Sequence, residues 1–161
     1  MAAVDYFLKI DGIAGESKDD KHPDEIQLES WSWGETNSGS MSAGGGGGAG
    51  KVSMHDFSFT MQINKASPEI FLACAQGKHI ASCVLTCRKA GTDQQEYLVI
   101  TFTDVLISSY QTGGGGGDVL PIESITFNFA EIEYSYAPQK DDGTLDAPIV
   151  HDVELKTMVM S

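Results

Sequence analysis

Apolar and polar residues alternate along much of the chain with a period of two, which is typical of β-strands that bury one face. The alternation is clearest after Lys51, where Phe57, Phe59 and Met61 alternate with polar residues. Strands are predicted in this way at residues 4–10, 25–33, 51–64, 80–88, 96–103, 105–111, 119–136 and 149–159.

The apolar phase changes within residues 25–33, after which Trp31 and Trp33 share one face and Ser30 and Ser32 share the other. Such a change indicates a β-bulge or a strand that passes from one sheet to another. If the tryptophans belong to the core, the two serines face solvent or a partner. We keep both readings of these serines open, since an ordinary polar surface also fits.

Residues 66–78 have the pattern of a short α-helix. Ser67 is the predicted N-cap, Pro68 suits the first turn and Gly77 can end the helix. A helix of two to three turns is not stable alone, so we expect it to pack on a sheet. Its buried face is predicted to comprise Phe71, Leu72 and Ala75.

These elements predict an all-β fold with one short helix, arranged as a sandwich or barrel. A length of 161 residues is suited to one domain that covers residues 1–161. No repeat of fixed period is present, and the glycine runs at residues 44–48 and 113–117 indicate loops between strands.

The net charge of the chain restricts the classes of partner that it can bind. With 23 acidic and 10 basic residues the formal charge is −13, which disfavours nucleic acids and anionic membranes. No apolar run approaches the roughly 20 residues of a membrane helix. The first residues also lack the features of a signal peptide. We therefore expect a cytoplasmic protein that would leave the cell only by another route.

The sequence contains few residues arranged for disulfide bonding, catalysis or metal binding. Cys74, Cys83 and Cys87 do not form a disulfide pattern, and Cys83 and Cys87 would lie about 13 Å apart on one strand face, too far for a bridge. We expect them to be buried as small apolar residues. His22 and the pair Asp19–Asp20 are predicted to be solvated. No catalytic or metal-binding motif is found, so neither an enzyme, a cofactor nor a metal site is predicted.

The glycine-rich stretch at residues 45–51 matches the first seven positions of a phosphate-binding loop, G-x-x-x-x-G-K. The eighth position, which must be Ser or Thr, is Val52. A strand rather than a helix follows, so the helix N-terminus that would hold a phosphate is missing. The stretch is better interpreted as a long loop between two paired strands. A nucleotide-dependent enzyme remains an alternative that Val52→Thr would test.

Several segments together resemble the Hcp (haemolysin-coregulated protein) family of the bacterial type VI secretion system. They are FLKIDGIAGES, DEIQLESWSWG, GGGGGAGKVSMHDFSFTMQINKASPEIFLACAQGKHI, RKAG, DQQEYLVITFTDVLISSYQTGG and FNFAEIEYSYAPQKDDG. The resemblance extends from Tyr6 to Gly143, and the segments occur in the family's order.

This resemblance implies a two-sheet β-barrel similar to phage tail-tube proteins. Six copies would form a ring, and rings would stack into a tube inside a contractile sheath, capped by a VgrG-type spike. The tube would be expelled without a signal peptide, and small effectors could be held in the ring channel. The alternative is a stand-alone ligand-binding β-barrel module.

The resemblance also assigns residues. The loop at residues 36–51 matches the extended loop through which family members reach a neighbouring ring or subunit. Its candidate stacking residues are Ser40, Met41, Gly45, Gly46, Gly47 and Lys51. Ser32 falls on the strand that faces the channel and is the first candidate for cargo contact, with Ser30 as the weaker candidate.

Overall fold

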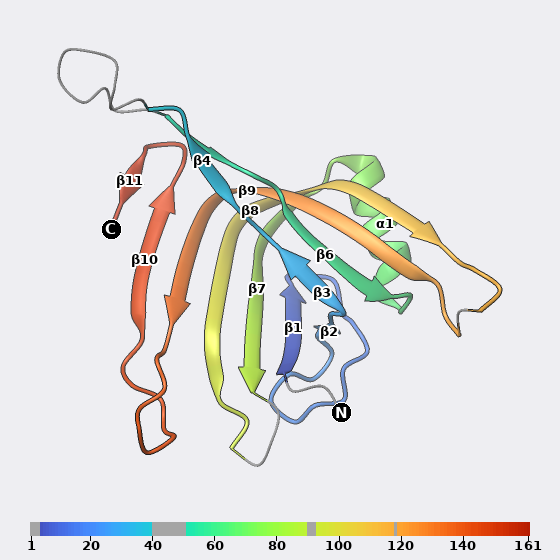
Figure 1. Cartoon of the computed structure of the whole chain (residues 1–161). Helices are drawn as coiled ribbons and strands as arrows, with labels where there is room; N and C mark the ends of the chain where they lie inside the picture. Colours follow the sequence, from blue (N-terminus) through green and yellow to red (C-terminus); the bar gives the residue numbers. More distant parts are fainter. Residues whose placement is uncertain (1–3, 40–50, 90–92, 118) are drawn as a thin grey trace.

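The computed structural model describes residues 4–39, 51–89, 93–117 and 119–161. This part of the chain consists mainly of β-strands with one helix, which confirms the predicted fold class (Figure 1). In chain order the elements are β1 (Val4–Ile10), β2 (Ile26–Gln27), β3 (Ser30–Ser32), β4 (Glu35–Asn37), β5 (Val52–Met54), β6 (Phe57–Gln62), α1 (Ala66–Gln76), β7 (His79–Lys89), β8 (Glu96–Gly113), β9 (Ile122–Tyr136), β10 (Ile149–Glu154) and β11 (Val159–Met160).

Nine strands form one curled antiparallel sheet with the path β11-β10-β9-β8-β7-β1-β2, to which β6 and β3 are joined through β9. The long strand β9 makes this branching possible. Its residues 122–127 pair with β6 and its residues 131–136 pair with β10, while β8 lies along its other edge. The sheet therefore wraps around a core in a barrel-like form.

The two ends of the barrel meet at the segment that contains β2 and β3. Strand β2 pairs with β1, whereas β3 pairs with β6. Between them, the amide of Leu28 donates to the carbonyl of Tyr6 and the amide of Glu29 donates to the carbonyl of Thr60, both at 2.9 Å. We call this segment, residues 26–32, the corner. The predicted phase change thus marks a strand that leaves one part of the sheet for another.

Aromatic side chains fill the centre of the barrel. Phe57, Phe102 and Phe127 are fully buried, and their ring centroids lie 5.0 Å apart in each pair. Cys83 and Cys87 lie in the same core as free thiols, as predicted. Burial raises the pKa of both thiols to about 12.

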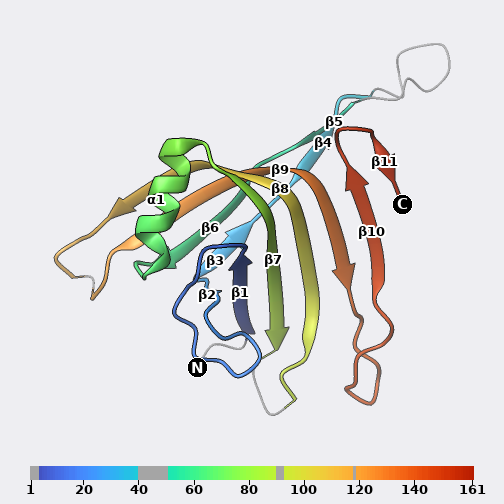
Figure 2. The ribbon, with the colours of Figure 1, turned by 180° about the vertical axis from the view of Figure 1, so that it is seen from behind.

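The helix is present but its predicted cap and face are wrong. α1 begins after Lys65, whose side chain makes no cap bond, and the Ser67 hydroxyl instead accepts from the Asn64 amide at 3.1 Å. Small residues pack it against β8: the buried positions are Ala66, Ser67, Ile70 and Ala73. Phe71 and Leu72 are 58% and 47% exposed. Figure 2 shows α1 beside the sheet, where it contacts β8. Gly77 ends the helix in a left-handed conformation (φ 61°), as predicted.

Several strand boundaries also differ from the prediction. The two strands predicted at residues 96–103 and 105–111 form the single strand β8, which continues to Gly113. The strand predicted at residues 51–64 is divided into β5 and β6, and the one at 149–159 into β10 and β11. In these three cases the ends of a strand depend on which neighbouring strand it pairs with. The local pattern of apolar residues does not identify that neighbour.

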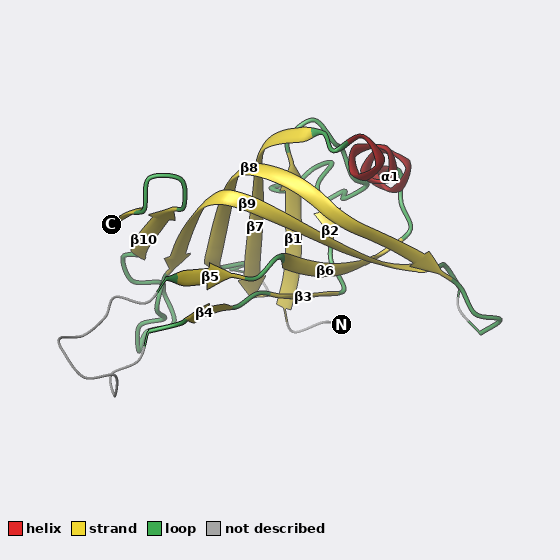
Figure 3. Ribbon diagram, turned by 90° about the horizontal axis from the view of Figure 1, so that it is seen from above, coloured by secondary structure: helices red, strands yellow, loops and turns green. Residues whose placement is uncertain are grey.

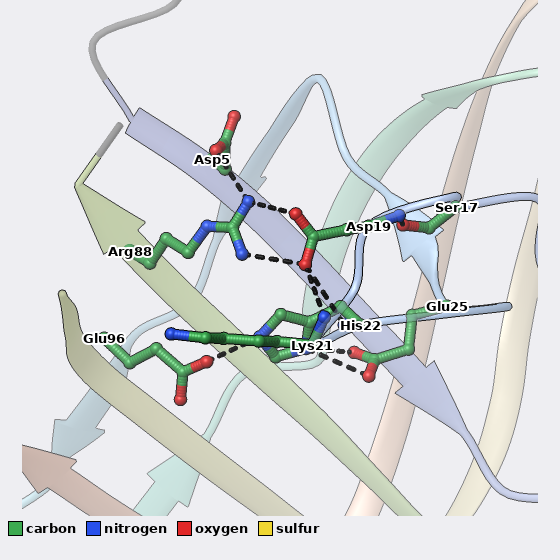
Figure 4. A network of polar contacts seen from close by, with 8 residues as sticks. All are labelled: Asp5, Ser17, Asp19, Lys21, His22, Glu25, Arg88 and Glu96. Atoms are coloured by element: carbon green, nitrogen blue, oxygen red, sulfur yellow. Dashed lines mark hydrogen bonds and ion pairs between the residues drawn. The ribbon is translucent and has the colours of Figure 1, made fainter. Parts of the chain in front are cut away.

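The loop between β1 and β2 is attached to the sheet by a network of polar contacts (Figure 4). His22, predicted to be solvated, is buried: its Nδ1 lies 2.9 Å from Glu25, its Nε2 lies 2.7 Å from Glu96, and its ring stacks on Phe7. The loop is tight at Gly15, where a Cβ atom would lie 2.5 Å from the carbonyl oxygen of Glu25.

Asp19, also predicted to be solvated, belongs to the same network. Its carboxylate accepts from both terminal nitrogens of Arg88, a buried residue of β7 that also donates to Asp5 at 3.2 Å. The predictions for His22 and Asp19 are wrong because their partners are supplied by distant strands.

Candidate functional site

The face of β3, β6, β9 and β8 that points away from the core carries two rows of uncharged polar side chains. Residues directly opposite each other in antiparallel strands lie on the same face. The first row comprises Ser32, Ser58, Thr126 and Ser109. The second comprises Ser30, Thr60, Ser124 and Gln111. We call these eight residues the hydroxyl face.

The hydroxyl face is an ordered surface because its side chains bond to one another across strands. Ser30 Oγ lies 2.6 Å from Thr60 Oγ1. Thr126 Oγ1 contacts the hydroxyls of Ser108 and Ser109 at 2.8 and 2.6 Å. The register of β8 against β9 shifts between Ile107 and Ser109, so the bulge sets both serines opposite Thr126.

Tryptophan side chains on the inward side of the chain around β3 fix the orientation of Ser30 and Ser32. Trp31, between Ser30 and Ser32, packs against the core, with its ring stacked on Phe57 at 6.0 Å. Trp33 donates from Nε1 to the carbonyl of His55 at 2.9 Å. Because the tryptophans point inward, the two serines point outward and are exposed. This orientation is the one predicted for the case that the tryptophans belong to the core.

The neutrality of the hydroxyl face contrasts with the rest of the chain. Neither row contains a charged residue, although the chain carries a formal charge of −13. The nearest carboxylate in the hydrogen-bond network is Asp56, which accepts from Ser108 Oγ at 2.5 Å. A surface of this kind can form many weak hydrogen bonds with a partner and does not depend on ion pairs.

The structure brings Ser30 and Ser32 together with six further residues that the sequence analysis did not select. Period-two alternation in β6 and β9 could have indicated Ser58, Thr60, Ser124 and Thr126, since each lies between buried residues. It could not indicate that these residues are opposite Ser30 and Ser32. That relation depends on two strand pairings, one between residues about 30 apart in the sequence (β3 with β6) and one between residues about 65 apart (β6 with β9).

The candidate stacking residues are placed only in part. Lys51 is exposed, and its amide lies 3.2 Å from Ser38 Oγ at the end of a two-stranded arm formed by β4 and β5. Thr36 and Asn37, predicted as loop, belong to β4 of this arm. Ser40, Met41, Gly45, Gly46 and Gly47 lie outside the described residues.

The described part of the chain holds no group of three or more His, Cys, Asp or Glu residues arranged to bind a metal. None of its helices has the length and apolarity needed to span a membrane.

Comparison with known proteins gives consistent matches. The family model described as "Type VI secretion system effector, Hcp" matches residues 7–136. Protein Hcp1 of Pseudomonas aeruginosa is 56% identical over 145 residues, which cover 89% of this chain and 90% of that protein.

Solved structures agree with these sequence matches. A type six secretion system protein superposes with a TM-score of 0.93 at 31% identity, covering 99% of this chain and all of the other. Hcp1 from Salmonella typhimurium gives a TM-score of 0.83 at 37% identity, with the same coverage. A type VI secretion system effector from Yersinia pestis gives 0.75 at 34% identity, covering 93% of this chain and 99% of that one.

Proposed function

Because this chain belongs to the Hcp family of the bacterial type VI secretion system, we propose that it is a structural subunit of the system's inner tube. Six copies close into a ring, and rings stack into a tube that is expelled from the cell without a signal peptide. The observation that carries the proposal is the 56% identity to Hcp1 of Pseudomonas aeruginosa over nearly the whole chain.

We propose further that the hydroxyl face lines the channel of the ring and contacts small effector proteins. Its eight uncharged residues support this role, because a tube must hold its cargo during assembly and release it after expulsion. Weak hydrogen bonds, each contributing about 0.5–1.5 kcal/mol net, allow both. Ser32 and Ser30 lie at one edge of the face, and Thr126 lies near its centre.

The arm of β4 and β5 and the loop at residues 36–51 are proposed to reach a neighbouring ring or subunit. The arm supports this, since β4 and β5 form a two-stranded sheet separate from the nine-stranded one and lie beside it (Figure 3). Ordering a run of five glycines costs conformational entropy, so stacking is expected to be weak in dilute solution. Stacked rings would then need nucleation by the spike or enclosure by the sheath. No catalytic step is assigned to the chain.

Size-exclusion chromatography coupled to light scattering, on the untagged chain at low and high salt, tests the ring. The expected mass is about six times the chain mass of 17.2 kDa. A monomer at every concentration would contradict the ring and would favour a stand-alone ligand-binding module. Deletion of residues 43–50 should leave the ring intact and abolish stacking; tubes formed at low concentration by the deleted chain would contradict the role of the loop.

A further inference from the structure

His22, in the loop between β1 and β2, has a buried imidazole ring of which both nitrogens face carboxylates (Figure 4). Nδ1 lies 3.0 and 2.9 Å from the two carboxylate oxygens of Glu25, and Nε2 lies 2.7 Å from Glu96 Oε1. Glu25 ends the loop, just before β2, whereas Glu96 is the first residue of β8. The ring therefore joins the loop to a strand that is 74 residues away in the sequence.

The proton content of the ring follows from these two contacts. A neutral imidazole has one N–H group, and its other nitrogen can only accept, as can both oxygens of an ionised carboxylate. With a neutral ring, the lone pair of one nitrogen would therefore face a carboxylate oxygen at 3.0 Å or less with no hydrogen between them. An imidazolium has an N–H group on each side and satisfies both contacts through charge-assisted hydrogen bonds.

The other charged groups of this network also favour the imidazolium. Arg88 of β7 is the like charge that opposes protonation, but its ion pairs with Asp5 and Asp19 compensate it. Asp19 also accepts from the amide of His22 at 3.2 Å. The adjacent cation, Lys21, has an exposed side chain. The two glutamates are thus left to the His22 ring, which is neutralised by neither of them when it is uncharged.

The loop is closed on itself by backbone hydrogen bonds and attached to the rest of the chain by side chains. The backbone bonds join Gly15 to Asp24, Ser17 to Glu25 and Asp24 to Ser17. The side-chain attachments join Glu16 to the amide of Lys65 before α1, Asp19 to Arg88 of β7, and His22 to Glu96 of β8. Of these three attachments, the one through His22 involves the side-chain type that ordinarily titrates near neutral pH, at about 6.5.

We propose that His22 is a pH-dependent switch: as an imidazolium it attaches the loop to β8, and loss of one ring proton releases the loop from the sheet at this point. The remaining N–H group can bond to one of the two glutamates, so the other contact is lost. The attachment is complete below about pH 6.5, where an unfolded chain would also hold the proton, and it weakens as the pH rises. Because Glu25 leads directly into β2, release also loosens the start of the corner. This inference concerns a single folded chain and does not depend on the tube function.

Nitrogen NMR spectroscopy of the isotope-labelled wild-type chain tests the proton content directly. At pH 7 both ring nitrogens of His22 should carry a bonded hydrogen, and their signals should be absent from His22→Gln, which identifies them. A ring nitrogen of His22 without hydrogen at pH 7 would overturn the proposal, because the ring would then not be the cation that the switch requires.

Amide hydrogen exchange followed by mass spectrometry tests the release of the loop. In the wild type, the protection of peptides from residues 13–25, corrected for intrinsic exchange rates, should fall at least about tenfold between pH 6.5 and pH 9. Peptides from β9 are the internal reference and should keep their protection. A wild-type loop whose protection does not fall with pH would overturn the switch.

Glu96→Gln separates the switch from a merely structural contact. The side-chain amide of glutamine can accept from an N–H group or donate to an unprotonated ring nitrogen, so it can bond to either form of the ring. The protection of residues 13–25 should then change less than about twofold over the same pH range. Glu133→Gln makes the same change at an exposed position of β9 and should behave as the wild type. Equal pH dependence in Glu96→Gln and the wild type would overturn the proposal.

Discussion

Arg88 and Asp19 form a two-point ion pair in which the guanidinium donates to both carboxylate oxygens, at 2.9 and 2.5 Å. Arg88 is buried within the sheet, and its guanidinium carbon lies 4.8 Å from the centre of the Phe7 ring. Asp19 belongs to the loop between β1 and β2. The pair therefore attaches this loop to β7 across 69 residues of sequence.

Replacement of Arg88 should be strongly destabilising. Arg88→Met keeps the volume but leaves Asp19 and Asp5 without their cation, and loss of one member of a buried pair costs about 3–5 kcal/mol. Urea denaturation followed by circular dichroism would measure the change. Lys9→Met, which removes an exposed cation from β1, is the control and should change the free energy of unfolding by less than about 0.5 kcal/mol. Equal losses in the two variants would contradict this role of Arg88.

The same pair should make the fold sensitive to acid. The hydrogen bonds from Arg88 hold the pKa of Asp19 well below its ordinary value of 3.8. A depressed carboxyl pKa contributes stability above the ordinary value, and that contribution is lost as the pH falls through 3.8 toward the pKa of the folded state. The free energy of unfolding of the wild type should therefore decrease more between pH 6 and pH 3 than that of Asp19→Asn. Parallel pH profiles would rule out this linkage.

The hydrogen bond from Ser67, in the N-terminal turn of α1, to the buried carboxylate of Glu123 should stabilise the fold. It accepts hydrogen bonds from the hydroxyls of Ser67 and Tyr110, and burial together with Glu123 raises the pKa of Tyr110. Ser67→Ala would leave a buried carboxylate oxygen without a partner, which should cost about 1–3 kcal/mol. Ser53→Ala, an exposed serine of the arm, should cost less than about 0.5 kcal/mol. If Ser67→Ala were as mild as Ser53→Ala in thermal denaturation, the bond to Glu123 would not stabilise the fold.

The three thiols should differ in reactivity. Burial and a pKa of about 12 keep Cys83 and Cys87 protonated and inaccessible at neutral pH, whereas Cys74 is half-buried on α1. Ellman's reagent should therefore titrate at most one thiol per folded chain and all three in denaturant. Cys74→Ser should abolish the reaction of the folded chain. A second thiol that reacts quickly without denaturant would contradict the buried positions.

A charge introduced on the hydroxyl face should reduce the binding of cargo proteins without changing the assembly of the ring. Ser58→Arg lies in the first row, and six copies would place six cations around the proposed channel. The ring mass should stay the same, while the proteins recovered with the purified ring, identified by mass spectrometry, should decrease at least about tenfold relative to wild type. Ser53→Arg on the arm is the control. Unchanged recovery with Ser58→Arg would contradict cargo contact by this face.

Local patterns predicted the fold class well because period-two alternation is visible in the sequence. The outward position of Ser32 followed from its neighbours Trp31 and Trp33, and the burial of Cys83 and Cys87 followed from their strand. Each of these features depends on residues within a few positions, so one sequence is enough to infer them.

Features that depend on distant partners could not be predicted in this way. His22 was predicted to be solvated because Glu96, which lies 74 residues away, cannot be identified as its partner from the sequence. The face of α1 was predicted from its largest residues, yet small ones such as Ala73 pack on the sheet and leave Phe71 exposed. The complete hydroxyl face needed the register of four strands.

The corner at residues 26–32 has a mechanical consequence. Along β8 and β9 a long ladder of hydrogen bonds shares any load, and sliding these strands apart requires many bonds to break together. At the corner the ladders are short: β2 pairs with β1 through Ile26 and Gln27, and β3 pairs with β6 through residues 30–32, with one further bond on each side from the amides of Leu28 and Glu29. Tension applied across the barrel would therefore break the short ladders of the corner first, while β8 and β9 stay paired.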